Sequence, residues 1–170
     1  MSQRVETRVR EPEQPTGRYE AVVALYANQR EQAASGAIVV RRKDVDFEVA
    51  RQGRLRQLTT PVYWPKHSAP GWSVFEQDIK RHSGKHVHQG GIVIFVLEGK
   101  GYTVVDGVRY DWEKGDLIVL PIKPGGCEHQ HFNLVEGEPC LWEAFVYHPY
   151  WQPLAQQVLQ RELSPEYKPA

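Results

Sequence analysis

The sequence predicts an all-β fold, a single barrel with one helix before it and one after it. From Ile38 onward, short runs of β-branched and aromatic residues alternate with turns that contain Gly, Pro and Asp. Many short strands at close spacing are typical of a sandwich or barrel. The dipeptide Asp106-Gly107 separates two of these runs. It indicates a two-residue hairpin, because a type I′ turn needs positive φ at both central residues.

We expect the strands to lie at residues 38–41, 45–49, 72–80, 92–97, 101–106, 108–111, 117–120, 127–134 and 141–147. No internal repeat is visible in the sequence, which favours one barrel over two. We therefore divide the chain into a mobile N-terminal arm (1–17), a helical segment (18–37), the barrel (38–150) and a C-terminal helix with a tail (151–170).

Apolar stripes predict the two helices. Val22, Leu25 and Tyr26 recur at the spacing of one helix face in the segment before the barrel. Residues 150–163 carry a second stripe, and Pro153 suits the first turn of a helix there. Each stripe is short, so the helices are expected to flank the barrel.

The composition excludes several classes of protein. Lys+Arg and Asp+Glu both number 21, so the net charge of the 170-residue chain is zero. Nucleic acids and anionic membranes both call for a basic excess, and neither is expected as a partner. The polar N-terminus has no apolar segment of a signal peptide, and no apolar run is long enough to span a bilayer. These features predict a cytoplasmic protein.

The two cysteines, Cys127 and Cys140, form neither a disulfide framework nor a CxxC motif. We expect free thiols, which are usual in a reducing compartment. A bridge between the two remains an alternative.

Histidines carry the main functional signal. Four of the seven form two H-x-H pairs, His86-Val87-His88 and His129-Gln130-His131. Residues i and i+2 of a strand point to the same face, so each pair projects two imidazoles to one side. If the two strands are neighbours, up to four imidazoles converge inside the barrel. Neutral imidazole is the commonest metal ligand, so a metal site is predicted, the alternative being a surface pair.

These segments resemble the two motifs of the cupin superfamily. Residues 84–88, followed by the corner 98–101, are similar to the first motif, and Gly115, Pro121 and the run 129–133 are similar to the second. The resemblance covers about 84–147. It implies a small single-domain cupin, whose fold is a jelly-roll or double-stranded β-helix barrel, with one bound divalent metal.

Two departures from the motifs narrow the resemblance. Ile92 stands where the first motif usually has a metal-binding glutamate, and the Pro-x-Gly step of the second motif is stretched over residues 121–126. Loss of the glutamate is the pattern of cupins that hold iron with three histidines, among them the gentisate, salicylate and β-diketone-cleaving dioxygenases. The second motif most resembles the gentisate 1,2-dioxygenase-like cupins, which are usually two-barrel chains.

The resemblance and the spacing together suggest roles for individual residues. His86, His88 and His129 are the expected metal ligands, with His131 beside the substrate as an acid or base. Exchange of the roles of His129 and His131 stays open, because both share a face. Further candidates are Arg81 and Gln130 as catalytic residues, and Gln89, Trp72, Tyr102 and Trp142 as substrate-binding residues.

Three neutral histidines leave a divalent ion its full charge, which favours an anionic, chelating substrate. We therefore expect an Fe(II) dioxygenase that cleaves a small aromatic hydroxy acid, or a related chelating anion, with O₂. Mn, Ni or Zn is an alternative metal, since affinity order alone does not choose among them. Two other functions stay open: a metal-containing cupin that binds a small molecule without turnover, and a non-redox isomerase or lyase. A homodimer is expected from the frequency of such assemblies.

Overall fold

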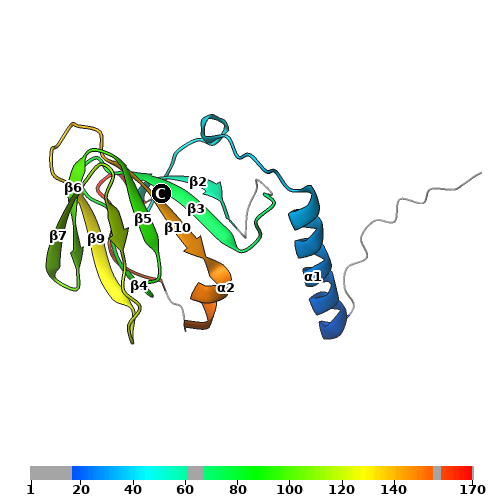
Figure 1. Cartoon of the computed structure of the whole chain (residues 1–170). Coiled ribbons are helices and arrows are strands. Elements are labelled where there is room, and N and C mark those ends of the chain that lie inside the picture. Colours follow the sequence, from blue (N-terminus) through cyan, green and yellow to red (C-terminus); the bar gives the residue numbers. More distant parts are fainter. Residues whose placement is uncertain (1–16, 61–66, 155–157, 170) are drawn as a thin grey trace, which may run out of the picture.

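Two antiparallel sheets face each other in the computed structural model, which describes residues 17–60, 67–154 and 158–169 (Figure 1). The six-stranded sheet has the order β1-β2-β3-β10-β5-β8 and the five-stranded sheet the order β11-β4-β9-β6-β7. The first sheet contains β1 (Glu48–Ala50), β2 (Gly53–Thr59), β3 (Trp72–Asp78), β10 (Leu141–Tyr147), β5 (Val93–Glu98) and β8 (Leu117–Val119). The second contains β11 (Leu159–Glu162), β4 (Lys85–His88), β9 (Cys127–Asn133), β6 (Lys100–Val105) and β7 (Val108–Glu113). This confirms the predicted all-β cupin barrel.

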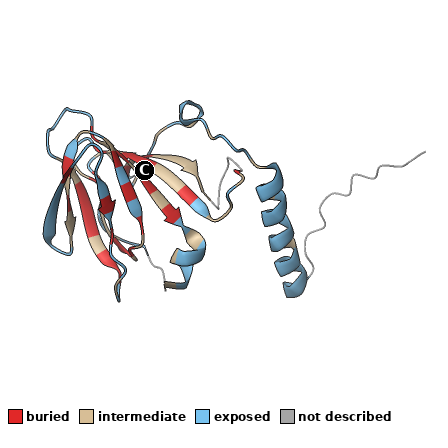
Figure 2. Ribbon diagram, in the orientation of Figure 1, coloured by how far each residue is buried: buried red, intermediate tan, exposed pale blue. Residues whose placement is uncertain are grey.

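Alternation along the strands places the core between the sheets. In β10, exposed or half-buried residues alternate with buried Trp142, Ala144 and Val146. Ile94 and Val96 do the same in β5, and the buried residues of both sheets, red in Figure 2, include one hydrophobic core cluster. Full burial of such a side chain contributes about 1.5–3 kcal/mol each. One end of this interior, toward β4 and β9, is lined by histidines rather than aliphatic residues.

The hairpin predicted at Asp106-Gly107 is present between β6 and β7. Asp106 has φ of 50° and Gly107 of 83°, the conformation that a type I′ turn requires at both centres. The register joins Val105 to Val108 directly across the turn. Asp106 accepts a backbone hydrogen bond from Glu128 at 3.1 Å, which ties the turn to β9.

The predicted C-terminal helix is wrong beyond residue 154. The chain forms one turn of helix, α2 (His148–Trp151), and a 3₁₀ turn, η2 (Gln152–Leu154), and then returns as β11. Leu159 of β11 pairs with Val87 of β4. A short apolar stripe fits a strand as well as a helix, and the open edge of β4 decides between them by offering backbone partners.

Two other expectations fail near the N-terminal side of the barrel. Residues 38–41 form no strand, and the only regular element there is the 3₁₀ turn η1 (Arg42–Asp44). Ile38 is 85% exposed, so this segment does not reach a sheet edge that would hold it as a strand. Strand β2 was not predicted, because arginines and glutamines interrupt its apolar residues.

Helix α1 (Arg18–Ser35) is present where the apolar stripe predicts a helix, and it projects away from the barrel (Figure 1). None of its residues is buried, and no part of the helix is red in Figure 2. Its contact with the rest of the chain is at its end, where the Gln32 side chain donates to the His67 carbonyl at 3.0 Å. The N-terminal arm expected over 1–17 lies outside the described residues except for Gly17.

Candidate metal centre

The two H-x-H pairs lie on neighbouring strands. β4 and β9 pair antiparallel, with His86 opposite His129 and His88 opposite Cys127. The ligand atoms of His86, His88 and His129 all lie within 4.8 Å of one another. These three imidazoles can therefore hold one metal ion.

Hydrogen bonds orient all three rings in the same way. The Nδ1 of His86 lies 3.3 Å from the Gly84 carbonyl, that of His88 lies 2.6 Å from the Gln89 carbonyl, and that of His129 lies 3.1 Å from the Cys127 carbonyl. A carbonyl oxygen only accepts, so each Nδ1 donates its hydrogen. Each Nε2 then keeps its lone pair, the arrangement that metal-binding histidines show.

His131 has the opposite arrangement. Its Nδ1 lies 2.8 Å from the Thr103 hydroxyl, which also accepts the indole N–H of Trp112 at 2.8 Å. Thr103 is fully buried, and its single hydroxyl hydrogen is satisfied by donation to His131 Nδ1. The Nε2 of His131 then carries the hydrogen, so this ring presents a donor and no lone pair.

The four histidines are neutral at physiological pH. Burial, assisted by His88 and His131, lowers the pKa of His86 to about 3. Burial also lowers the pKa of His88, and holds the pKa values of His129 and His131 well below the ordinary value for histidine, with neighbouring histidines adding to the effect for the last two. Metal binding requires deprotonated ligands, and this cluster meets that condition without releasing a proton.

The histidines form one wall of a cavity of about 310 Å³ between the sheets. Gln57, Phe75 and Gln77 come from the opposite sheet, and Trp151 covers the His88 ring at a centroid distance of 5.6 Å. The described lining residues are Gln52, Leu55, Gln57, Phe75, Gln77, His86, His88, Ile92, Ile94, His129, His131, Trp142, Ala144, Trp151 and Val158. None of these described residues carries an acidic group or a lysine or arginine.

Of the other candidate site residues, Trp142 lines this cavity, and its ring lies 5.0 Å from that of His131. Arg81 lies outside, with 63% of its side chain exposed and an ion pair to Glu136 at 3.4 Å. Gln130 points to the other face of β9, as strand alternation requires, and donates to the Ser83 carbonyl at 2.9 Å.

The remaining candidates also lie away from the cavity. The amide of Gln89 donates to the Lys123 carbonyl at 2.8 Å and holds a loop in place. Trp72 packs on Tyr147 with ring centroids 5.0 Å apart. Tyr102 stacks on Phe132 at 4.6 Å, with the Arg109 guanidinium over its ring. These side chains are absent from the described lining of the cavity.

Sequence reasoning missed Gln52, Gln57, Gln77 and Trp151 as cavity residues. The signal for two of them was present in the alternation of β3 and β2: Phe75 and Gln77 face inward on β3, and Leu55 and Gln57 face inward on β2. A glutamine in a strand suggests a solvent-facing position, so residue type did not indicate that these two glutamines line a cavity.

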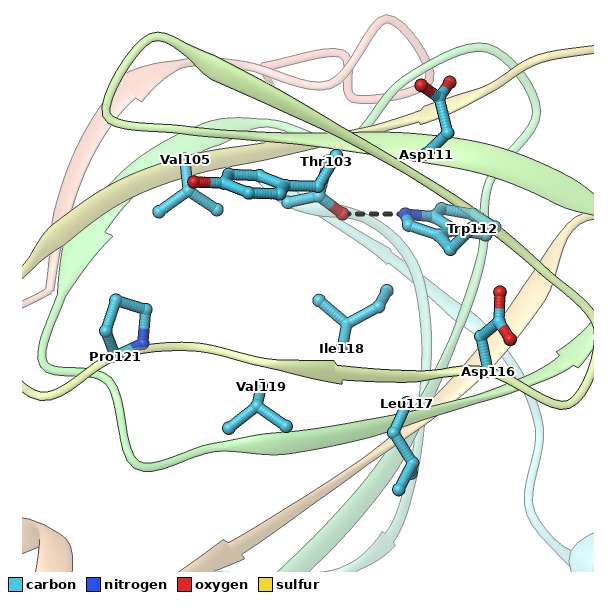
Figure 3. A pocket seen from close by; sticks show the side chains of 10 residues that line it. Thr103, Val105, Asp111, Trp112, Asp116, Leu117, Ile118, Val119 and Pro121 are labelled. Atoms are coloured by element: carbon cyan, nitrogen blue, oxygen red, sulfur yellow. Dashed lines mark hydrogen bonds between the residues drawn. The ribbon is translucent and has the colours of Figure 1, made fainter.

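A second cavity, of about 480 Å³, lies where β7 and β8 form the edges of the two sheets (Figure 3). Thr103 and Trp112 line it, and their hydrogen bond is drawn in Figure 3. The Trp112–Thr103–His131 chain of hydrogen bonds therefore forms the partition between this cavity and the histidine cavity.

Comparison with known proteins agrees with the fold. Residues 74–147 match the cupin domain model Cupin_2. A cupin domain therefore occupies residues 74–147 of this chain. This cupin is similar in structure to a Cupin 2 conserved barrel domain protein from Salinispora arenicola (TM-score 0.53, 20% identity, 71% of this chain and 98% of that one). It is also similar to salicylate 1,2-dioxygenase from Pseudoaminobacter salicylatoxidans (TM-score 0.52, 21% identity, 87% of this chain and 38% of that one).

Curated relatives share sequence with part of this cupin. Acireductone dioxygenase of Rattus norvegicus is 31% identical over 116 residues, which is 65% of this chain and 61% of the relative. Acireductone dioxygenase of Phaeosphaeria nodorum is 30% identical over 86 residues, which is 48% of this chain and 47% of the relative. The chain thus spans about half to three fifths of the length of these relatives.

Two further expectations can be compared with the structure. Cys127 and Cys140 are both buried and both free, so the bridge left open by the sequence is not formed. Among the described residues, no helix is long and apolar enough to cross a membrane.

Proposed function

We propose that this cupin is an Fe(II)-dependent dioxygenase that binds a small chelating oxyanion and O₂ in the histidine cavity. The observation that carries the proposal is the orientation of His86, His88 and His129, whose Nε2 lone pairs converge at one wall of the cavity between the sheets. The relatives named acireductone dioxygenase and the fold shared with salicylate 1,2-dioxygenase support the same class of reaction.

The donor set fits a divalent transition metal. Imidazole suits Fe, Ni, Zn and Cu, whereas carboxylate sites suit Mg and Ca. Ile92 is 4% exposed and lines the cavity where a carboxylate ligand stands in other cupins, so the ligand set stays neutral. A bound ferrous ion would supply a Lewis acid and a redox partner between the substrate and O₂.

His131 acts on the bound substrate in this proposal rather than on the metal. Its Nε2–H is a hydrogen-bond donor in the cavity, fixed by Thr103 and Trp112. A preorganised donor in a dry site stabilises negative charge on a substrate oxygen without any rearrangement of solvent. The neutral ring keeps its proton at Nε2 and acts there as a hydrogen-bond donor to a substrate oxygen.

The apolar residues exclude water from the reaction. Leu55, Ile92, Ile94 and Ala144 line the cavity between the two polar walls. A low-dielectric lining strengthens each electrostatic contact with a bound anion. The same lining limits competing protonation of reactive groups by solvent.

The proposal is tested by oxygen uptake on protein purified under nitrogen and loaded with Fe(II). Gentisate, salicylate, catechols, acetylacetone and enediols are supplied as chelating anions. We expect substrate-dependent O₂ uptake with one iron per chain, abolished in His86→Ala and kept in the control variant His82→Ala, which changes a histidine outside the described cavity lining. Metal binding without O₂ uptake for any of these compounds would contradict the dioxygenase and favour a binding or non-redox function.

We also propose that the chain forms a homodimer. Most of the stability of a helix in a protein comes from packing of its apolar face, yet α1 (Arg18–Ser35) has no buried residue. Leu25 and Tyr26 are 53% and 61% exposed. Contact of α1 with a second copy would bury these side chains.

A further inference from the structure

We propose that the cavity selects chelating oxyanions whose far end carries an uncharged group that both donates and accepts hydrogen bonds, such as a hydroxyl or an amide. Gln57, Gln77 and Trp142 are the residues that recognise this group. The inference rests on the proposed function, because it takes the histidine wall as the place where the two oxyanion atoms bind. It assigns a role in ligand recognition to the opposite wall of the same cavity, for which the sequence motifs give no role.

The opposite wall is built by the register of the six-stranded sheet. Gln77 of β3 pairs with Leu55 of β2 on one side and with Trp142 of β10 on the other. In the next row Gln57 pairs with Phe75. All five side chains line the cavity. A polar patch of two glutamines therefore faces the histidines across the barrel, and the Trp142 indole lies beside it with its ring 5.0 Å from that of His131.

The width of the cavity fits one small ring. Facing sheets lie roughly 10 Å apart, and the cavity measures about 310 Å³. A ligand that binds the metal through two adjacent oxygens therefore has its opposite end at the glutamine wall. The hydrogen-bonding groups of the glutamine wall therefore decide which ligands bind.

The wall holds hydrogen-bonding groups that the protein itself does not use. The indole nitrogen of Trp142 is buried and has no partner among the described residues. The Gln77 amide nitrogen donates to the Gln52 carbonyl at 2.6 Å, while no bond of its amide oxygen occurs in the described part of the chain. Gln57 makes no side-chain hydrogen bond within residues 17–60, 67–154 and 158–169.

Unused buried polar groups point to a ligand, because buried donors and acceptors are rarely left unsatisfied. The Trp142 N–H is a donor only, and the Gln77 oxygen is an acceptor only. Together they match a group that accepts from one and donates to the other. A hydroxyl or an amide does both, whereas a methyl group does neither.

A second anionic group at this end would be rejected. None of the described lining residues is a lysine or an arginine, and Arg81 is exposed and paired with Glu136. Burying a carboxylate without a counter-ion is costly. The positive charge of the metal lies at the opposite, histidine wall and is partly offset by the chelating oxygens, so it provides no counter-ion at the far end, which must be uncharged.

Three hydroxypyranones test this selection, because they chelate through the same two oxygens and differ at one ring position. Allomaltol carries a methyl group there, kojic acid a hydroxymethyl group, and comenic acid a carboxylate. Their affinities are measured by calorimetry on Zn(II)-loaded protein, in which no turnover occurs. We expect kojic acid to bind about tenfold more tightly than allomaltol, and comenic acid at least about tenfold more weakly than kojic acid.

Variants assign the selection to named residues. In Gln77→Leu the affinity for kojic acid falls to that for allomaltol, while the affinity for allomaltol and the zinc content stay unchanged. Trp142→Phe keeps an aromatic ring, removes the indole N–H and produces the same loss for kojic acid alone. Gln57→Leu, at a half-buried position, provides the comparison if Gln77→Leu does not fold.

Equal affinity for kojic acid and allomaltol, or comenic acid binding as tightly as kojic acid, would overturn the inference. These outcomes are distinct from failure of the proposed function. Selective binding to the zinc protein with no O₂ uptake by the iron protein would leave the selection standing and remove the dioxygenase. O₂ uptake by the iron protein with unselective binding to the zinc protein would support the dioxygenase and overturn the proposed selection.

Discussion

The Thr103 hydroxyl and the His131 imidazole are joined at 2.8 Å, and the same hydroxyl oxygen accepts the Trp112 indole N–H at 2.8 Å. This bond gives His131 a proton at Nε2, whereas backbone carbonyls give His86, His88 and His129 a proton at Nδ1. The four imidazoles of two H-x-H pairs therefore divide into three lone pairs and one donor. The hydrogen-bond partners of each ring decide which nitrogen carries the proton, and the H-x-H spacing alone does not predict it.

We predict that Thr103→Val disables His131 without removing the metal. Valine keeps the shape and removes the hydroxyl, so His131 Nδ1 loses its donor and Trp112 loses its acceptor. We expect O₂ uptake to fall by about 10- to 100-fold with metal content unchanged, and stability to fall by about 1–3 kcal/mol because of the unsatisfied indole. Nitrogen NMR of the imidazoles reads the change in tautomer.

Thr103→Ser is the matched control for this prediction, because it restores the hydroxyl. Recovery of both the NMR pattern and the O₂ uptake in that variant is expected. An unaltered His131 tautomer in Thr103→Val would show that the bond does not set the protonated nitrogen.

We predict that removal of His129 and removal of His131 have different effects on the metal. His129→Ala takes away an Nε2 lone pair, so metal affinity should fall by about 100-fold or more, whereas His131→Ala should retain metal and lose turnover. Metal content after dialysis, measured by mass spectrometry, distinguishes the two. If His131→Ala lost the metal and His129→Ala retained it, His131 would be the metal ligand and His129 the residue beside the substrate.

The pH dependence of the metal-free protein follows from the buried histidines. Burial lowers the pKa of His86 to about 3, far below the ordinary value of 6.5, and also lowers the pKa values of His88, His129 and His131. Below pH 6.5 the unfolded chain binds protons that the folded chain does not. Stability is therefore complete above pH 6.5 and is lost as the pH falls toward 3.

In this window His86 adds a slope of about 1.4 kcal/mol per pH unit, and the lowered pKa values of the other three histidines add to it in the same direction. Thermal unfolding of the metal-free protein between pH 7 and pH 4 measures the total slope. His86→Asn should make the slope shallower by about one proton. A melting temperature that stays constant from pH 6.5 to pH 4.5 would mean that the histidines titrate normally in the folded state.

Local patterns were enough to predict the strands that carry strict alternation. β10 has the predicted bounds of 141–147, and the β6–β7 hairpin lies at the predicted Asp106-Gly107 turn. β11 was not predictable in this way, because its conformation depends on the open edge of β4, about 75 residues earlier in the chain. The sequence therefore predicts a helix in this segment, whereas in the structure it is a strand paired with β4.

The site was predictable in its histidines and not in its glutamines. The H-x-H spacing brings His86 and His129 together once β4 and β9 are neighbours. Gln77 faces the same cavity only because β3 lies beside β10 in the opposite sheet. Arg81 was an attractive carboxylate partner by chemistry, but it lies just after β3 with its side chain in solvent. Residue type suggests chemistry, and the packing of the two sheets decides which residues meet.

We predict that α1 (Arg18–Ser35) is held by a second copy of the chain. Sedimentation of the wild-type protein should show a dimer, and Leu25→Glu with Tyr26→Glu should shift it to a monomer because charges would be buried at the contact. The helical circular dichroism signal should fall together with the dimer, since packing of an apolar face supplies most of the stability of a helix in a protein. The melting of the barrel should change little, because no residue of α1 is buried against it. Asn28→Glu, an exposed position on the same helix that lies about 115° around the axis from the centre of its apolar stripe, should leave the dimer intact. A wild-type monomer that keeps the full helical signal would contradict the prediction, because α1 would then be stable without a partner.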